Sequence, residues 1–173
     1  HKVIVGTNRL DDDKQALVQG HLNRTRMFVS NLYRVIVNPA WILPSRITNG
    51  ELVGKVEADP DYLKKKNIKK KTLPNGKEVL VQGFGSGNVL GKGKCLLEKT
   101  TASFLHDTDK RGLFRKRRRD FSHGCMRVHN AVGFAHWILQ RDGWDDKEIE
   151  KSFKLQRTQR GMDLKKPISF MTE

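Results

Sequence analysis

The sequence predicts one α+β domain that is rich in β-strands. Five short stretches combine β-branched or aromatic residues with Gly, Pro, Asn or Lys at their ends, which is typical of strands: KVIVG, RVIVNPAWILP, EVLVQG, KCLLE and ASFLH. They occupy the first two thirds of the chain, whereas helical spacing of apolar residues dominates after residue 130. This separation favours α+β over alternating βαβ units. A length of 173 residues with 36% hydrophobic content suits a single domain.

Two segments of the first half depart from the strand pattern. Residues 11–31 are polar with scattered apolar positions, which favours a loop with a helical turn. Residues 45–78 are expected to form an insertion over the sheet. Within it, the Asp-Pro pair at residues 59–60 marks the start of a helix. The sequence PNG at residues 74–76 indicates a tight turn before the strand EVLV.

The last third predicts two helices and a final strand. NAVGFAHWILQRDGW places apolar residues at helical spacing, and Gly143 lies where a helix would end. DDKEIEKSFKL predicts a second helix, with Asp145 or Asp146 as the N-cap and with Ile149 and Phe153 on one face. PISFM is expected to be the closing strand.

The charge is strongly positive, with 34 Lys and Arg residues against 19 Asp and Glu residues and a net charge of +15. The basic residues cluster at 64–66, 69–71 and 115–119, which indicates either solvated loops or a surface for anionic partners. Aromatic residues make up 8% and none interleaves with the lysine runs, so specific nucleic-acid recognition is not favoured. No run of eighteen apolar residues predicts a membrane span. Because the chain opens inside a strand, we expect an export signal or an earlier domain to precede it.

The two cysteines need separate explanations, because they form neither a disulfide framework nor a paired zinc motif. Cys95 in GKGKCLLEK has the setting of a small apolar strand residue. Cys125 in FSHGCMRVHN has histidines around it. A thiol becomes a useful nucleophile beside an imidazole. A metal site is the alternative, although no second cysteine or helical His repeat supports it. Its candidate ligands are His106, His123, Cys125 and His129.

Gly124 adds a second feature to the Cys125 motif. Glycine permits a backbone bend that turns consecutive N–H groups toward one point. Such donors can hold the oxyanion of a tetrahedral intermediate. The motif can therefore combine a nucleophile with an oxyanion hole, provided that a distant histidine is folded beside the thiol.

HDT at residues 106–108, followed by SHGCMRV at residues 122–128, closely resembles the active-site signature of L,D-transpeptidase catalytic domains. Further blocks resemble the large periplasmic members in the same order, so that the resemblance covers nearly the whole chain: VIVNPAWILP, DPDYLKKKNI, GKGKCLLE, FLHDTDKRGLF and NAVGFAHWILQRDGWDD. It implies a mixed β-sandwich with flanking helices and a capping insertion at about residues 45–78 over the catalytic groove. Relatives usually have further strands before the point that matches HKVIVG.

The resemblance also implies a role for each motif residue. Cys125 corresponds to the acyl-accepting nucleophile and His106 to its base, with the backbone carbonyl of Asp107 orienting the imidazole. The amides of Gly124 and Cys125 correspond to the oxyanion hole, and His123 would shape that hole or the surroundings of the thiol.

Three flanking residues complete the motif. Ser122 is expected to contribute to the substrate site by ordering the turn. Arg127 corresponds to an arginine that could pair with a carboxylate of substrate or protein. His129 receives no chemical role and is expected to lie at the surface or in packing.

The implied reaction is a two-step acyl transfer on peptidoglycan stem peptides in the periplasm or cell envelope. The thiol would attack a tetrapeptide stem, release D-alanine and form a thioester, which the amine of a neighbouring diaminopimelate resolves into a cross-link. Water as acceptor would give an L,D-carboxypeptidase, and another amine would give wall attachment. The thiol, imidazole and amides supply this chemistry without a metal or organic cofactor. The competing class is a basic module that binds wall polymer or nucleic acid without turnover. The sequence does not fix the oligomeric state.

Overall fold

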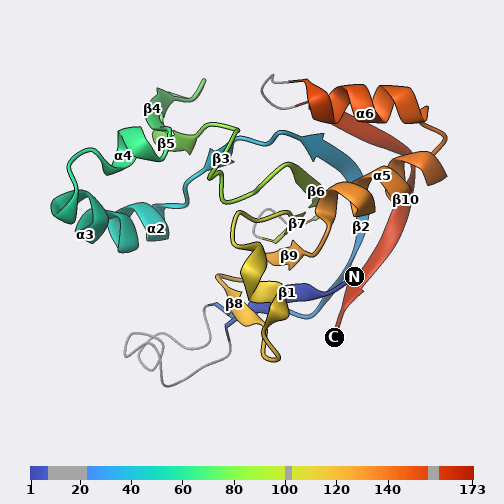
Figure 1. Cartoon of the computed structure of the whole chain (residues 1–173), viewed down its shortest axis with the longest axis horizontal. Coiled ribbons are helices and arrows are strands. Elements are labelled where there is room, and N and C mark those ends of the chain that lie inside the picture. Colours follow the sequence, from blue (N-terminus) through green and yellow to red (C-terminus); the bar gives the residue numbers. More distant parts are fainter. Residues whose placement is uncertain (8–22, 100–102, 156–159) are drawn as a thin grey trace.

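The computed structural model describes residues 1–7, 23–99, 103–155 and 160–173 (Figure 1). A seven-stranded mixed sheet with the order β10-β2-β6-β7-β9-β1-β8 forms the body of the protein. The pairs β7–β9 and β1–β8 are parallel, and the other neighbours are antiparallel. The strands span β1 (Val3–Gly6), β2 (Phe28–Val37), β6 (Gly93–Leu97), β7 (Leu105–His106), β8 (Asp120–Ser122), β9 (Met126–Val128) and β10 (Arg160–Thr172).

One face of this sheet forms the main apolar core against α5 (Ala131–Arg141) and α6 (Asp146–Lys154) (Figure 1). The helices contribute Ile138, Leu139 and Ile149, each at most 1% exposed. Complete burial of such a side chain stabilises the fold by about 1.5–3 kcal/mol. The strand residues of this core are Leu32, Val35, Val37, Cys95, Leu97, Leu105, Met126, Val128, Met162 and Leu164. Since strand side chains alternate between faces, their sequence neighbours on β6, β7 and β9 point away from the helices.

The first C-terminal helix ends, and the second begins, as the sequence predicts. The side chain of Asn130 caps α5 by accepting from the Gly133 amide at 3.2 Å, and Gly143 follows the helix end at φ +86°. Asp145 caps α6 and accepts from the amides of Lys147 and Glu148. The α+β class, with mixed sheets and flanking helices, is thus confirmed.

A second lobe has its own sheet and its own apolar cluster. Leu43, Leu52 and Ile68 are buried in that cluster. The sheet has the order β3-β5-β4. Figure 1 shows the lobe's helices and strands to the left of the main sheet. The elements are β3 (Trp41–Ile42), α2 (Ser45–Asn49), α3 (Glu51–Ala58), α4 (Tyr62–Lys65), β4 (Ile68–Thr72) and β5 (Glu78–Gln82).

The lobe extends beyond the insertion expected at residues 45–78. Trp41 pairs with Gln82, and Ile42 pairs with Val81, so two strands join at its base. Two helices precede the expected Asp-Pro start, and the helix after it is the single turn α4. The turn at residues 74–76 forms as expected, with Gly76 at φ +78° and the Leu73 amide donating to the carbonyl of Lys77.

The assignment of residues 11–31 to a loop is wrong for its last four residues and lies outside the described residues for 11–22. Residues 28–31 belong to β2, where they pair with residues 169–172 of β10. This distant pairing outweighs the polar local sequence. β10 is also much longer than PISFM, with a register shift between Asp163 and Ile168. In the described part of the chain, no helix is long and apolar enough to cross a membrane.

Candidate active site

Three neighbouring strands bring charged side chains together on the face that lies away from the helices. Lys94 on β6 pairs with His106 on β7, and His106 pairs with Arg127 on β9. Because paired residues place their side chains on the same face, the three form a row across the sheet. Each of them follows or precedes a core residue, and the row is therefore held in place by the main core.

Cys125 lies at the end of this row, immediately before β9. The Met126 amide donates to the carbonyl of Phe104 at 3.1 Å, which continues the β7–β9 register to Cys125 and Phe104. The Phe104 ring lies 5.4 Å from the His106 ring. The thiol and the imidazole also share the same cationic neighbours, Lys94 and Arg127. The structure therefore brings the two residues from distant sequence positions to one region.

The His106 ring is fixed by its own backbone neighbourhood. Its Nδ1 lies 2.5 Å from the carbonyl oxygen of Asp107. Since a carbonyl only accepts, Nδ1 carries the proton and Nε2 has a lone pair. The ring is buried at 6% exposure, and burial lowers the pKa of His106 to about 3, with the charges of Arg127 and Lys94 adding to the effect. The imidazole is therefore neutral at physiological pH.

The side-chain carboxylate of Asp107 has a different role from the backbone carbonyl of the same residue. It is 2% exposed and accepts from the Lys92 amide at 3.0 Å and from Arg111 at 2.9 Å. Gly91, at φ +59°, lies against it, and a Cβ at Gly91 would come within 2.4 Å of the carboxyl group. The carboxylate thus anchors the segment after β7, a role that sequence reasoning missed because it depends on contacts with the loop that precedes β6.

Hydrogen bonds define the turn at residues 122–125. The hydroxyl of Ser122 donates to the Cys125 carbonyl at 2.5 Å and accepts from the Gly124 amide at 3.2 Å. Gly124 has φ +112°, a conformation that favours glycine. Its carbonyl accepts from Thr25 at 3.0 Å. Ser122 is 3% exposed, so it can order the turn but has little surface for substrate.

The remaining motif residues differ in exposure. His123 is exposed at the tip of this turn. His129 is also exposed, and its ring meets that of Phe114 edge to face at 5.2 Å. The alternative metal site is not supported, because no three His, Cys, Asp or Glu side chains of the described residues gather in an arrangement that could hold an ion.

The electrostatics of the two thiols differ. Burial raises the pKa of Cys95 to about 12, in keeping with its 4% exposure in the core. Burial also raises the pKa of Cys125, but a backbone hydrogen bond from Phe104 and the charges of Lys94 and Arg127 oppose this. Cys125 is half-buried. It is thus the thiol with both access and cationic neighbours.

Arg127 has an incompletely satisfied side chain. Its Nε is buried and has no hydrogen-bond partner among the residues that the structure describes. A buried donor without an acceptor costs about 1–3 kcal/mol. Burial lowers the pKa of Arg127, and the charges of Asp109 and Cys125 oppose that shift. An acceptor supplied by a ligand would relieve the cost.

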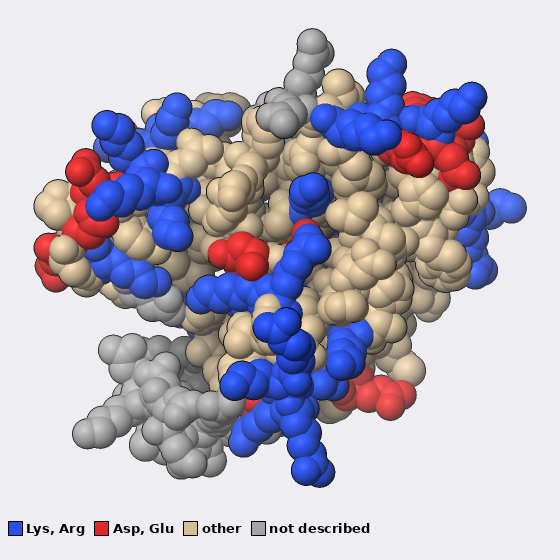
Figure 2. All heavy atoms as spheres, viewed as in Figure 1, with Lys and Arg blue, Asp and Glu red and all other residues tan. Residues whose placement is uncertain are grey.

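Part of the basic run at residues 115–119 has structural contacts. Figure 2 shows Lys and Arg side chains gathered over the lower centre of the visible face, where Figure 1 draws η1 (Arg111–Arg115) and β8. Arg118 pairs with Asp120 at 2.9 Å. Arg119 donates to the carbonyls of Val3 and Lys116. These two arginines hold the run against β1 and β8.

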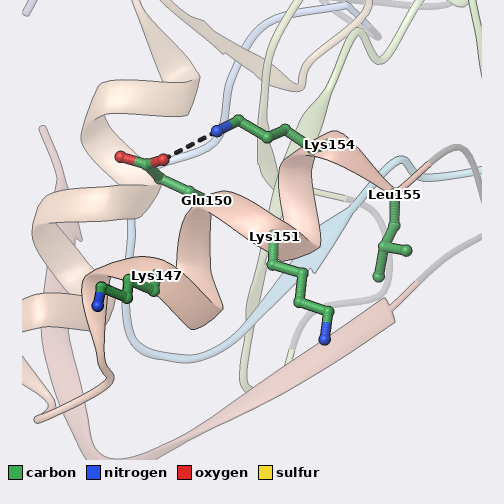
Figure 3. A pocket seen from close by; sticks show the side chains of 5 residues that line it. All are labelled: Lys147, Glu150, Lys151, Lys154 and Leu155. Carbon is green, nitrogen blue, oxygen red and sulfur yellow. Dashed lines mark hydrogen bonds and ion pairs between the residues drawn. The ribbon is translucent and has the colours of Figure 1, made fainter.

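Two surface hollows lie away from Cys125 and His106. One is an open hollow along α6, where Glu150 pairs with Lys154 at 3.0 Å (Figure 3). A second lies on the lobe between Ile42 and Leu80. Neither is lined by Cys125 or His106. The candidate site is therefore separate from these two hollows and is identified by its side-chain chemistry on the sheet face.

Comparison with known proteins gives two findings. A family model described as YkuD, L,D-transpeptidase catalytic domain, matches residues 1–149. The chain is also 31% identical over 160 residues to a Haemophilus influenzae protein named "Putative L,D-transpeptidase". That match covers 84% of this chain but only 30% of the relative's length. The resemblance carried by HDT and SHGCMRV is thus confirmed at the level of the family.

Proposed function

This chain belongs to the L,D-transpeptidase catalytic domain (YkuD) family, and we propose that it is a cysteine-dependent L,D-transpeptidase acting on peptidoglycan tetrapeptide stems. The observation that carries the proposal is the pairing of β7 with β9, which joins a ring-oriented, neutral His106 to the turn that bears Cys125. We further propose that it works in the periplasm or cell envelope, where its substrate lies.

The first step is proton transfer and attack. The lone pair of His106 Nε2 accepts the proton of the Cys125 thiol, and the sulfur attacks the carbonyl between the L-centre of diaminopimelate and the terminal D-alanine. With a pKa of about 3 in the free protein, His106 is a weak base. Negative charge that develops on the sulfur raises its basicity, because an opposite charge nearby favours the imidazolium.

The oxyanion that forms in this step needs hydrogen-bond donors to stabilise it. The amide of Cys125 follows a glycine whose backbone conformation turns the chain at this point. The Gly124 amide is engaged with Ser122 at 3.2 Å, a long contact. We propose that Gly124 shares its N–H between Ser122 and the oxyanion, with Cys125 supplying the second donor. His123 would shape the open side of this hole.

Collapse of the intermediate releases D-alanine and leaves a thioester. The imidazolium of His106 gives its proton to the departing amine, so the C–N bond breaks as the S–C bond is retained. The buried Nε of Arg127 is the candidate partner for a carboxylate of the stem peptide. An amine of a neighbouring diaminopimelate then attacks the thioester, transfers its proton to His106 and restores the thiol.

The lobe is proposed to act as a cap over the groove in which the stem binds. It carries exposed lysines at 64–66 and 69–71. The lobe has its own apolar cluster, and the paired strands β3 and β5 attach it to the rest of the protein. It can therefore act as one unit. A positive surface of this kind would attract an acidic wall polymer.

The proposal is tested with purified protein and a disaccharide tetrapeptide, with products identified by mass. We expect loss of D-alanine that disappears in Cys125→Ala. Turnover that persists in that variant would overturn the assignment, and absence of turnover in the unmodified protein would favour a binding module. In the same assay, cross-linked dimers indicate transpeptidation and tripeptide release indicates a carboxypeptidase.

A further inference from the structure

Lys94 is a charged residue of β6 to which the family signature assigns no task. Its register partner is His106, and its Nζ lies 3.9 Å from the centre of the Phe104 ring. The side chain is half-buried and makes no ion pair with a residue that the structure describes. Burial of an ammonium is unfavourable unless negative charge compensates it. Lys94 therefore needs a partner at this face of the sheet.

The surroundings offer two such partners. The face of the Phe104 ring attracts the ammonium by a cation–π interaction. Cys125 lies beside Phe104 because the Met126 amide donates to the Phe104 carbonyl. The attraction between a charged Lys94 and an ionised Cys125 raises the pKa of the lysine and lowers that of the thiol, against the opposite effect of burial.

We propose that Lys94 is a positioning residue that stabilises the Cys125 thiolate and keeps His106 neutral until the thiol proton arrives. This inference deepens the proposed transpeptidase function and rests on it. A fixed cation favours negative charge on the sulfur and disfavours positive charge on the imidazole. The imidazolium that forms during attack is then a stronger acid toward the departing D-alanine amine.

The charged side chains that act on Cys125 are Lys94 from β6 and Arg127 from β9. The other titratable groups of this region are His106 on β7, which shares these two cationic neighbours, Asp109 beyond β7 and His123 in the turn. Arg127 keeps its charge at any working pH, and Asp109 acts on Arg127. Among the cations that act on the thiol, Lys94 is the one that a neutral, similarly long side chain replaces with little change of shape.

The experiment measures the rate of Cys125 alkylation by iodoacetamide against pH, with the modified residue identified by peptide mass. In Lys94→Met, we expect the profile to move upward by about one pH unit, so that alkylation at neutral pH slows about tenfold. Lys94→Arg keeps the charge and should retain most of the rate. Lys92→Met, which removes an exposed charge two residues away, is the matched control. A Lys94→Met profile that coincides with that of the control overturns the proposal.

A reciprocal measurement covers the case in which Lys94→Met does not fold. The titration of the Lys94 side chain is followed by NMR in the unmodified protein and in Cys125→Ser. Loss of the thiolate should lower the lysine pKa, whereas identical titrations overturn the proposal. Neither measurement uses peptidoglycan. Their failure is therefore distinguishable from failure of the proposed function, which is read from D-alanine release.

Discussion

The Nδ1 of His106 lies 2.5 Å from the backbone carbonyl oxygen of Asp107, the residue that follows it. A carbonyl cannot take up a proton in this role, so it fixes the ring and its tautomer without adding a charge to the site. The same Asp107 uses its buried carboxylate to hold Arg111 and the Lys92 amide. Ring orientation and loop anchoring are thus combined in one residue.

Gly91→Ala should disturb this arrangement. A Cβ at Gly91 would lie 2.4 Å from the Asp107 carboxyl group, and the residue has φ +59°. We expect a loss of about 2–4 kcal/mol in the free energy of unfolding, from backbone strain and displacement of the carboxylate. Urea denaturation measures this loss. Gly76→Ala is the matched control, since its φ is +78° with open space around it, and it should cost only about 1 kcal/mol. Equal losses at the two glycines would contradict the packing role of Gly91.

Ser122→Ala removes the hydroxyl that ties the Cys125 carbonyl to the Gly124 amide. We expect the unfolding free energy to fall by about 1–3 kcal/mol, because buried polar partners lose their hydrogen bonds. Acylation should slow as well, since the turn that presents the thiol loses its order. Ser86→Ala, at an exposed loop position, serves as the comparison and should change neither quantity. A stable Ser122→Ala protein with normal acylation would exclude this role.

The low pKa of His106 predicts a specific dependence of stability on pH. Between about pH 6.5 and pH 3, the unfolded chain binds a proton at residue 106 that the folded protein does not bind. The contribution of the neutral His106 ring to the free energy of unfolding is therefore fully present above pH 6.5. It declines as the pH falls through this range. Going from pH 7 to pH 5, the unmodified protein should lose about 2 kcal/mol more than His106→Gln.

Thermal or urea unfolding at several pH values checks this difference. His123→Gln provides the control, because His123 is exposed. It should keep the pH dependence of the unmodified protein. The same slope in His106→Gln and in the unmodified protein would mean that residue 106 titrates normally.

The lobe should be removable at its base. Ile42 and Val81 are cross-strand partners, so a short Gly-rich turn can join them in place of residues 43–80. We expect the shortened protein to fold, because the main core draws on other residues, and to retain alkylation of Cys125. Processing of polymeric peptidoglycan should fall more than reaction with a free stem peptide. Circular dichroism reports whether the shortened protein folds, and the reaction rates with the polymer and with the free stem peptide report the change in processing. Global unfolding would show that the lobe belongs to the main core.

Local signals in the sequence were sufficient for α5, α6 and the PNG turn, because caps, apolar spacing and turn residues act over short distances. They failed for β4, where Ile68 is the only buried residue among five and lysines follow it. The pairing of β4 with β5 along its whole length forms that strand. The two ends of the lobe were missed for the same reason, since Trp41 and Gln82 meet only through pairing.

The same distinction between local sequence signals and distant strand pairing applies to the candidate site. Its motif residues could be identified from HDT and SHGCMRV, because the family signature keeps them at fixed positions. Lys94 and the Asp107 carboxylate could not, because their significance depends on which strands lie beside one another. A lysine in a strand gives no signal in the sequence that its ammonium lies over Phe104.

The most direct test is the intact mass of the protein after brief incubation with a tetrapeptide stem, followed by peptide mapping. We predict an adduct equal to the stem without its D-alanine, attached at Cys125, and no adduct in either Cys125→Ala or His106→Ala. An adduct of that mass on another residue, or rapid formation of the Cys125 adduct in His106→Ala, would contradict this prediction.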